Sequence, residues 1–346
     1  MNEHRWNPVC VRPDNLVRPV PIDPSGRNGP TKRQAAGPRY RQTSAGLYVP
    51  ADVDAGVVEQ RIFEQAHRIR GEGAVTGWAA LRWHGAAFFD GTTLGGAVQL
   101  PVPLAVGQSR MRADPRVTLR QAQLAPSERI FIGGIWCATV QRALFDAMRT
   151  ESDVRAAVVC MDMAAAARLI SVSLMWRYVA LRPAWTGVPL VRAALRLASN
   201  DSRSPQETRL RLVWVIDAGL ASPLCNVPVF SKSGRLLGYP DLFDPVAGAV
   251  GEYDGEDHKG RDRHRADVAR EQLFRNHGLE YFTVVGGDLL DRRMVVDRMH
   301  GTRARANFDP PEERAWTLEP PPWWTPIEDL DTHLVRTGEA AMLVRT

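Results

Sequence analysis

A short polar segment, SNDSRSP at residues 199–205, divides the sequence into two regions with different periodicity. After it, stretches of helical period alternate with short apolar stretches bounded by turn residues. This succession predicts an α/β domain. The expected elements are a helix at 205–219, strands at 227–230, 235–243 and 248–254, a helix at about 262–277 and a strand at 281–286.

The region before the break is predicted to be a mixed, mainly helical domain. The first 38 residues contain many prolines and few apolar runs, so we expect an irregular arm there. Residues 39–50 alternate like a short strand of a hairpin, and the helices and strands of the domain should follow. The expected helices lie at 57–70, 74–91, 139–150, 153–169, 174–178 and 188–199, and strands are expected within 101–139.

Four domains or segments result from this division: an arm at 1–38, a mixed helical domain at 39–198, an α/β domain at 199–305 and a tail at 306–346. The tail contains EPPPWWTP, and its prolines favour extended structure. We expect Trp323 and Trp324 to dock the tail onto a surface of the protein.

Composition narrows the class of protein. The net charge is +5, which suits a nucleic-acid partner, and all but three of the 44 basic residues are arginine. No apolar run approaches the ~18 residues of a membrane-spanning helix, and no signal peptide is recognisable, so we expect a cytoplasmic protein without a membrane partner. The four cysteines are far apart, which argues against a zinc site or a disulfide framework and favours free, buried thiols.

The most informative residues are acidic ones on the second and third strands after the break. Alternate side chains of a strand share a face, so Glu252 and Asp254 of EYDG should point the same way. Asp241 lies on the preceding strand, and the ten residues between it and Glu252 are enough for a turn and an antiparallel return. Carboxylates brought together in this way repel one another. A divalent cation with a preference for hard oxygen ligands, Mg²⁺ or Mn²⁺, would relieve that repulsion.

These residues resemble the core of the PD-(D/E)XK nucleases, and residues 204–286 resemble in particular the very-short-patch-repair (Vsr-like) endonuclease domain. The matching segments are SPQE, PDLFD, GEYDGEDH and RHRADVAREQLFRNHGL. The resemblance implies a restriction-endonuclease-like fold, with a central mixed sheet flanked by helices. It also implies that Glu207, Asp241 and Glu252 hold the metal, with Asp254 beside them, and that the metal activates water for phosphodiester hydrolysis.

One position departs from the nuclease motif. The nuclease family has a lysine two residues after the glutamate, and in this chain that position is Asp254. His258 or Lys259 from the next turn could take the place of the missing lysine. A fold that retains the nuclease architecture without cutting DNA is therefore the alternative.

Simpler roles remain open for each of these residues. Glu207 belongs to a capping box that begins at Ser204, and Asp254 with Gly255 is a common hairpin-turn dipeptide. Asp241 could cap a turn, and His258 could be an ordinary surface histidine. The arginines around the next helix could contact DNA phosphates or could form a solvated charged face. These arginines are Arg261, Arg263, Arg265, Arg270 and Arg275, of which the first four are the predicted DNA contacts.

The first half of the chain resembles another family over about residues 40–170. GLYVP, AVTGWAALRWHGA and WCATVQRALFDAMR are similar to segments of AbiEi-like antitoxin and regulator proteins. This resemblance implies DNA binding and a cognate toxin or defence partner. Two functions follow as hypotheses: a metal-dependent DNA endonuclease in phage defence or DNA repair, and a non-catalytic DNA-binding regulator or antitoxin.

Overall fold

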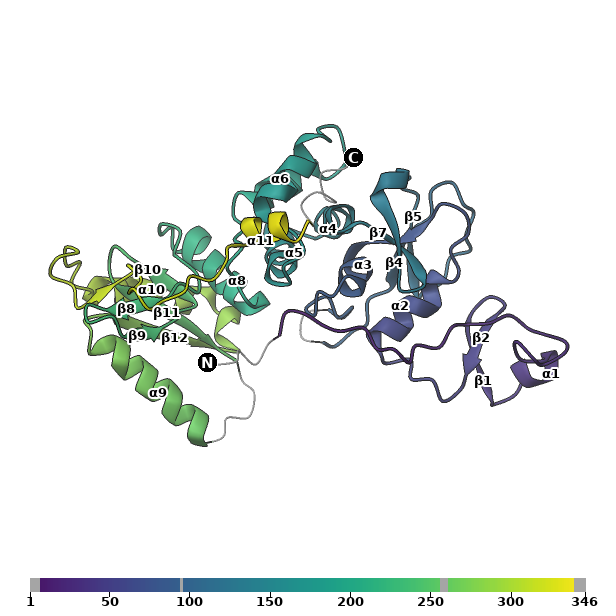
Figure 1. Cartoon of the computed structure of the whole chain (residues 1–346), viewed down its shortest axis with the longest axis horizontal. Helices are drawn as coiled ribbons and strands as arrows, with labels where there is room; N and C mark the ends of the chain where they lie inside the picture. Colours follow the sequence, from purple (N-terminus) through teal and green to yellow (C-terminus); the bar gives the residue numbers. More distant parts are fainter. Residues whose placement is uncertain (1–6, 94–95, 256–260, 339–346) are drawn as a thin grey trace. The chain divides into compact units, whose positions relative to one another are not determined.

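The computed structural model of the chain describes residues 7–93, 96–255 and 261–338, with residues 261–267 described by their backbone alone. The chain forms two compact units. Unit 1 comprises residues 1–196 together with 330–346, and unit 2 comprises residues 197–329 (Figure 1). Both contain helices and sheets, so the mixed α/β class expected from the sequence is confirmed.

Unit 1 is built on a five-stranded mixed sheet with the order β5-β4-β3-β7-β6. Its strands are β3 (Ala74–Val75), β4 (Val102–Ala105), β5 (Val117–Arg120), β6 (Arg129–Ile132) and β7 (Ile135–Ala138). The helices are α2 (Val58–Ala66), α3 (Gly77–Trp83), α4 (Val140–Met148), α5 (Val154–Ala166), α6 (Val172–Ala180), α7 (Val188–Leu195) and α11 (Leu330–Arg336), with a short 3₁₀ helix η1 (Pro126–Glu128).

Local signals explain where several of these helices begin. The side chains of Asp153 and Ser171 accept hydrogen bonds from main-chain N–H groups in the first turns of α5 and α6, as N-caps do. Thr76 stands at the same position before α3, but its hydroxyl makes no cap bond and donates instead to Asp146 of α4. A tertiary contact has therefore replaced the local one.

The arm before the first strand has little regular structure, as its prolines indicate, but it is attached to unit 1. It contains one short helix, α1 (Lys32–Ala35), and leads into a hairpin of β1 (Tyr40–Ser44) and β2 (Leu47–Pro50). Val20 pairs with Tyr48 of the hairpin, and the N–H of Cys10 donates to the carbonyl of Gly85 after α3.

Unit 2 contains a mixed sheet with the order β10-β11-β12, made of β10 (Leu242–Asp244), β11 (Ala249–Asp254) and β12 (Glu280–Val285). β10 is antiparallel to β11, and β11 is parallel to β12, because α9 (Arg261–Arg275) crosses over between them. A second small sheet has the order β13-β8-β9, from β13 (Trp316–Thr317), β8 (Val229–Ser231) and β9 (Leu236–Gly238). The remaining elements are α8 (Pro205–Leu212), η2 (Val213–Asp217), η3 (Asp288–Leu290) and α10 (Arg292–Arg305).

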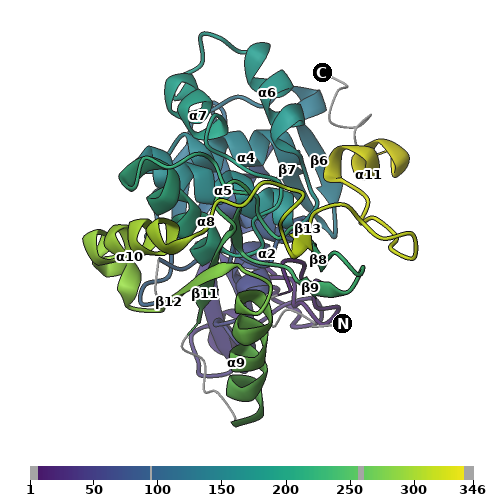
Figure 2. The same cartoon turned by 90° about the vertical axis from the view of Figure 1, so that its left-hand side faces the viewer.

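Two apolar clusters lie on opposite faces of the mixed sheet. On one face, Trp214 of η2 and Met299 of α10 pack with Phe282 of β12. On the other, Phe274 of α9 packs with Tyr281 of β12 and with residues of the small sheet. α9 and α10 thus cover β12 from opposite sides (Figure 2). This is the arrangement of a mixed sheet flanked by helices.

The single strand expected at 235–243 is wrong. Leu236–Gly238 and Leu242–Asp244 are separate strands that belong to different sheets. Pro240 lies between them and lacks the N–H that a continuous ladder needs, while its carbonyl accepts from the N–H of Asn226.

The segment after α10 is divided between the units. β13 pairs with β8, and the ring of Trp324 lies 5.2 Å from that of Phe230, so the expected docking is confirmed for Trp324. The ring of Trp323 lies 6.3 Å from that of Phe230, but this side chain remains 61% exposed. The following helix α11 belongs to unit 1, where Asp331 accepts hydrogen bonds from Ser171 and Ser173.

The four cysteines are free thiols, as expected; Cys137 and Cys225 are buried and the other two partly so. Within the described ranges, no helix combines the length and the apolar character needed to cross a membrane.

Candidate functional site

The pairing of β10 with β11 determines where the predicted carboxylates lie. Phe243 is opposite Val250, and Leu242 is opposite Gly251. Extending this antiparallel register by one residue sets Asp241 opposite Glu252, on the face that carries Phe243 and Val250. Both side chains are buried, each with 5% of its surface exposed. The ten-residue spacing in the sequence therefore does bring these two acids together on one face.

A main-chain hydrogen bond holds Asp241 in place, and the neighbouring acids shift its pKa. One carboxylate oxygen, Oδ2, accepts from the N–H of Tyr253 at 2.8 Å, which ties the residue just before β10 to β11. Burial raises the pKa of Asp241 well above its ordinary value, and the charges of Glu252 and Glu207 raise it further. The three acids proposed from the sequence thus interact electrostatically in one region of unit 2.

Glu207 combines this role with the simpler one. The hydroxyl of Ser204 accepts from the N–H of Glu207 at 3.2 Å and caps α8, which is the first half of the predicted capping box. In the second half, the Glu207 side chain reaches the N–H of Arg203 and not that of Ser204. The Glu207 carboxylate is buried and its Oε2 accepts from the N–H of Arg203 and from Nδ2 of Asn226, at 2.9 and 2.8 Å. It therefore stabilises the start of the helix while it also contributes negative charge near Asp241.

Arg270 supplies positive charge to this cluster. Its guanidinium Nη2 lies 3.2 Å from Oε2 of Glu252, and its side chain is 28% exposed. The same cation lowers the pKa of Asp241, against the larger effects of burial and of the two glutamates. Gly238 allows the ring of Phe274, on the same helix, to pack closely against β9, because a Cβ at this position would lie 2.9 Å from that ring.

The other residues proposed from the sequence fall at different places. Asp254 is the last residue of β11, opposite Val285 of β12, and is partly exposed. His258 and Lys259 lie outside the described residues. The backbone places Arg261, Arg263 and Arg265 in the first turns of α9, and their side chains are likewise outside what the structure describes.

Three residues that contact or interact with the carboxylates are not predicted from the sequence to lie beside them. Arg270 was expected to face phosphates, yet it is four residues before the buried Phe274, and this i,i+4 spacing already indicates that it faces the sheet. Tyr281 of β12 has its hydroxyl pKa raised by burial and by the charge of Glu252. Asn226, which donates to Glu207, carries no signal in the sequence.

The donor chemistry of the cluster can be compared with the needs of a metal ion. Asp241, Glu252 and Glu207 offer carboxylate oxygens, which are the ligands that Mg²⁺ and Mn²⁺ prefer. Among the residues that the structure describes, no group of three acidic, histidine or cysteine side chains is gathered closely enough to hold a metal ion as it stands. The residue types fit such an ion, and Arg270 balances part of their charge in the arrangement observed.

Comparison of the chain with protein-family models, with curated proteins and with solved structures gave no match. The carboxylates and Arg270 are therefore the features of unit 2 from which a function can be inferred.

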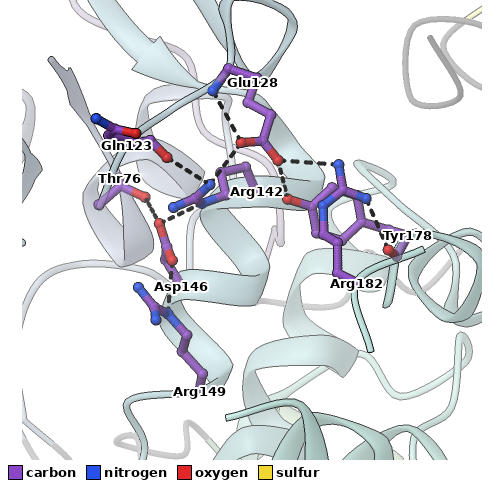
Figure 3. Close-up of polar contacts among 9 residues, drawn as sticks. Thr76, Gln123, Glu128, Arg142, Asp146, Arg149, Tyr178 and Arg182 are labelled. Atoms are coloured by element: carbon purple, nitrogen blue, oxygen red, sulfur yellow. Dashed lines mark hydrogen bonds and ion pairs between the residues drawn. The ribbon is translucent and has the colours of Figure 1, made fainter. Parts of the chain in front are cut away.

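Unit 1 contains a second group of buried charges, on η1, α4 and α6 (Figure 3). Arg142 lies between two acids, with Nη1 2.7 Å from Glu128 and Nε 3.0 Å from Asp146. Glu128 also accepts from the hydroxyl of Tyr178 at 2.7 Å and pairs with Arg182 at 3.2 Å. Further bonds to these acids come from Thr76, Arg149 and the main chain of Ala125.

The chemistry of this second group is that of a structural network. Each carboxylate has several donors, and Arg142 joins α4 to η1. A network whose acids are fully hydrogen-bonded makes the packing of its helices specific and offers no unpaired group for catalysis. We therefore assign it to the stability of unit 1.

Arg270→Gln should change both the stability of unit 2 and its response to metal. Loss of the cation leaves Glu252 and Asp241 to repel each other, so we expect a loss of about 1–2 kcal/mol, less than for a fully buried pair because Arg270 is partly exposed. Magnesium should then raise the melting temperature of the variant more than that of the wild type.

Arg275→Gln is the matched control for this change. Arg275 lies on the same helix, but it pairs with Glu271 and Glu280 near the surface. If Arg275→Gln and Arg270→Gln have equal effects on melting with and without magnesium, Arg270 has no special role at the carboxylates.

Proposed function

We propose that unit 2 is a metal-dependent endonuclease that hydrolyses phosphodiester bonds of DNA, acting in phage defence or DNA repair. The proposal is supported chiefly by one observation: Asp241 and Glu252 are buried together on one face of the sheet, at the end of an antiparallel strand pair. The charge of Glu207 also raises the pKa of Asp241. Burial beside other acids raises the pKa of a carboxyl group, and titratable groups whose pKa is strongly shifted in this way are typical of functional sites.

The metal would be Mg²⁺ or Mn²⁺, held by Asp241, Glu252 and Glu207. When bound, it would supply a water activated for attack and positive charge for the phosphoryl transition state. The protein's own contribution is to keep these carboxylates buried and oriented, through the Tyr253 N–H at Asp241 and the Asn226 amide at Glu207. Arg270 and the cation would compete for Glu252.

A plasmid assay tests this proposal directly. Supercoiled and mismatched duplexes should be nicked or cut in the presence of magnesium and left intact with a chelator. Wild-type protein that binds DNA but cuts none of these substrates under any divalent cation would contradict it.

A second function is favoured by two specific observations. Asp254 stands where the nuclease motif has lysine, and Arg270 already pairs with Glu252. Both suit a DNA-binding regulator or antitoxin that retains the nuclease fold as a scaffold and acts with a cognate toxin or defence protein. Binding without cleavage, unaffected by Asp241→Asn, is the expected result in that case.

A cytoplasmic location is part of this proposal, because DNA and the expected protein partners are found there.

The arginines at the start of α9 carry a separate prediction. If Arg263 and Arg265 contact phosphates, replacing each by alanine should reduce the slope of log affinity against log salt by about 1, with weaker binding to all sequences. Anisotropy titrations over a range of salt concentrations measure this slope. A wild-type affinity that does not depend on salt would remove phosphate contacts from the proposal.

A further inference from the structure

A row of arginines follows one edge of the unit 1 sheet. β5 is the edge strand and pairs only with β4 among the described strands. The segment that leads into and along β5 contains Arg110, Arg112, Arg116 and Arg120, and we call these four residues the basic edge. The only acid between residues 106 and 127 is Asp114, so the segment has a surplus of positive charge.

Asp114 offsets the charge of only one member of the basic edge, Arg116, and it shares its own charge with Arg68 as well. Nη1 of Arg68 lies 3.2 Å from this carboxylate, and that arginine is itself buried. Arg116 forms two bonds to the same carboxylate, at 2.9 and 2.7 Å. These bonds hold the pKa of Asp114 well below its usual range, with the hydrogen bond from Arg116 as the largest cause. Two guanidinium groups thus share one carboxylate, and the surplus charge remains at the surface.

The segment is fixed in position although its first part has no regular structure. Arg68 donates to the carbonyl of Arg112 at 3.0 Å, and Arg116 donates to the carbonyl of Gln42 in β1 at 3.2 Å. The side chains of Arg110 and Arg112 are exposed, and within the described part of the chain neither makes an ion pair. A fixed backbone that presents exposed guanidinium groups lowers the entropy lost when an anion binds.

The composition of this surface favours a phosphate-bearing partner over a protein partner. Protein interfaces depend on aromatic and aliphatic anchors. None of the large exposed hydrophobic residues of the described chain falls between Val98 and Phe131. Arginine binds phosphate with two parallel hydrogen bonds, and phosphate contacts supply the affinity of sequence-independent DNA binding.

We propose that the basic edge of unit 1 binds the phosphate backbone of duplex DNA, independently of base sequence. This inference rests on the proposed function, because it takes DNA as the binding partner from there. It assigns to unit 1 a second DNA contact, in addition to the site in unit 2. It requires no metal and none of the carboxylates of unit 2.

The test compares Arg110→Ala/Arg112→Ala with Arg33→Ala/Arg196→Ala in the full chain. Both double variants remove two exposed positive charges from unit 1, so they have the same net charge. Binding of a short labelled duplex is measured by anisotropy at several salt concentrations in the presence of a chelator. We expect the first variant to lose about 30-fold in affinity at about 0.15 M salt and to reduce the log–log slope by about 2, as counterion release predicts for two phosphate contacts. The control should lose less than about 3-fold.

A charge-preserving variant completes the design. Arg110→Lys/Arg112→Lys should keep most of the salt slope, because the charge remains. The proposal is overturned if the alanine variant binds DNA as tightly as the control variant does. If that alanine variant also self-associates, the role of the arginines is to protect the edge strand from pairing with another chain. It is also overturned if polyglutamate binds wild type as tightly as DNA with the same dependence on Arg110 and Arg112.

The two proposals can fail separately. DNA affinity that depends on Arg110 and Arg112, without metal-dependent cleavage, would support the basic edge and contradict the nuclease. Cleavage that requires Asp241, with binding that is indifferent to Arg110 and Arg112, would do the reverse.

Discussion

Asp241→Asn and Glu252→Gln should each reduce metal-dependent cleavage of supercoiled plasmid by about 100-fold or more. Each substitution keeps the size of the side chain but removes a formal charge from the proposed cation site. Activated water and charge stabilisation depend on the same ion, so the loss of either carboxylate should affect both. Initial rates of nicking over a range of magnesium concentrations measure the effect.

DNA binding is the control for these variants. Neither substitution touches the basic edge, so the affinity for duplex in a chelator should stay within about 3-fold of wild type. Cleavage at the wild-type rate by both variants would mean that the chemistry takes place elsewhere in the chain.

Asp241→Asn should also stabilise the protein at neutral pH. The pKa of Asp241 is raised on folding, so its contribution to stability is fully present below the pKa of the unfolded chain and is lost as the pH rises through the folded value. Asparagine retains an oxygen that can accept from the Tyr253 N–H and carries no charge. The gain in melting temperature should therefore be largest near neutral pH and should disappear as the pH falls below ~4, where the aspartate becomes neutral in the unfolded chain as well as in the folded protein. A gain that is independent of pH would show that charge is not its cause.

Arg142→Ala should have the largest effect on stability, a loss of about 3–5 kcal/mol. The substitution removes the cation that Glu128 and Asp146 share and leaves two buried carboxylates with fewer partners (Figure 3). For a unit of this size, the melting temperature should fall by about 10 °C. Calorimetry or thermal denaturation followed by circular dichroism measures this change.

Arg149→Ala provides the comparison within the same network. Arg149 contacts only one of the two acids, and Asp146 would keep its bonds from Arg142 and Thr76. Its side chain is also more exposed, so we expect a loss of about 1 kcal/mol. Equal losses for the two substitutions would show that the bridging position of Arg142 has no special importance.

Several parts of the fold and site follow from local sequence alone. The α/β class, the extended character of residues 39–50 and the capped start of α8 depend on turns, caps and apolar periods that involve neighbouring residues. The pairing of β10 with β11 also follows from a short connection, and it determines that Asp241 and Glu252 share a face. Such features need only alternation along a strand and a turn of suitable length.

Other features were decided by contacts between residues far apart in the chain. Residues 235–243 have the composition of one strand, but Pro240 and the pairing of each half with a different sheet divide them. Arg270 is directed to Glu252 because the parallel crossover returns α9 onto the face that bears the carboxylates. Glu128 meets Tyr178 across fifty residues of sequence through the packing of α6 near η1.

The sequence by itself thus determined the elements, the order of the acidic residues and the strand face on which they lie. The tertiary structure decided which cation lies beside the acids and which charges are buried together in unit 1. The physical reason is that periodicity and capping act within a few residues, whereas the partner of a long charged side chain depends on how whole helices pack. Burial then makes that choice of partner energetically important, because an unmatched charge in the interior costs several kcal/mol.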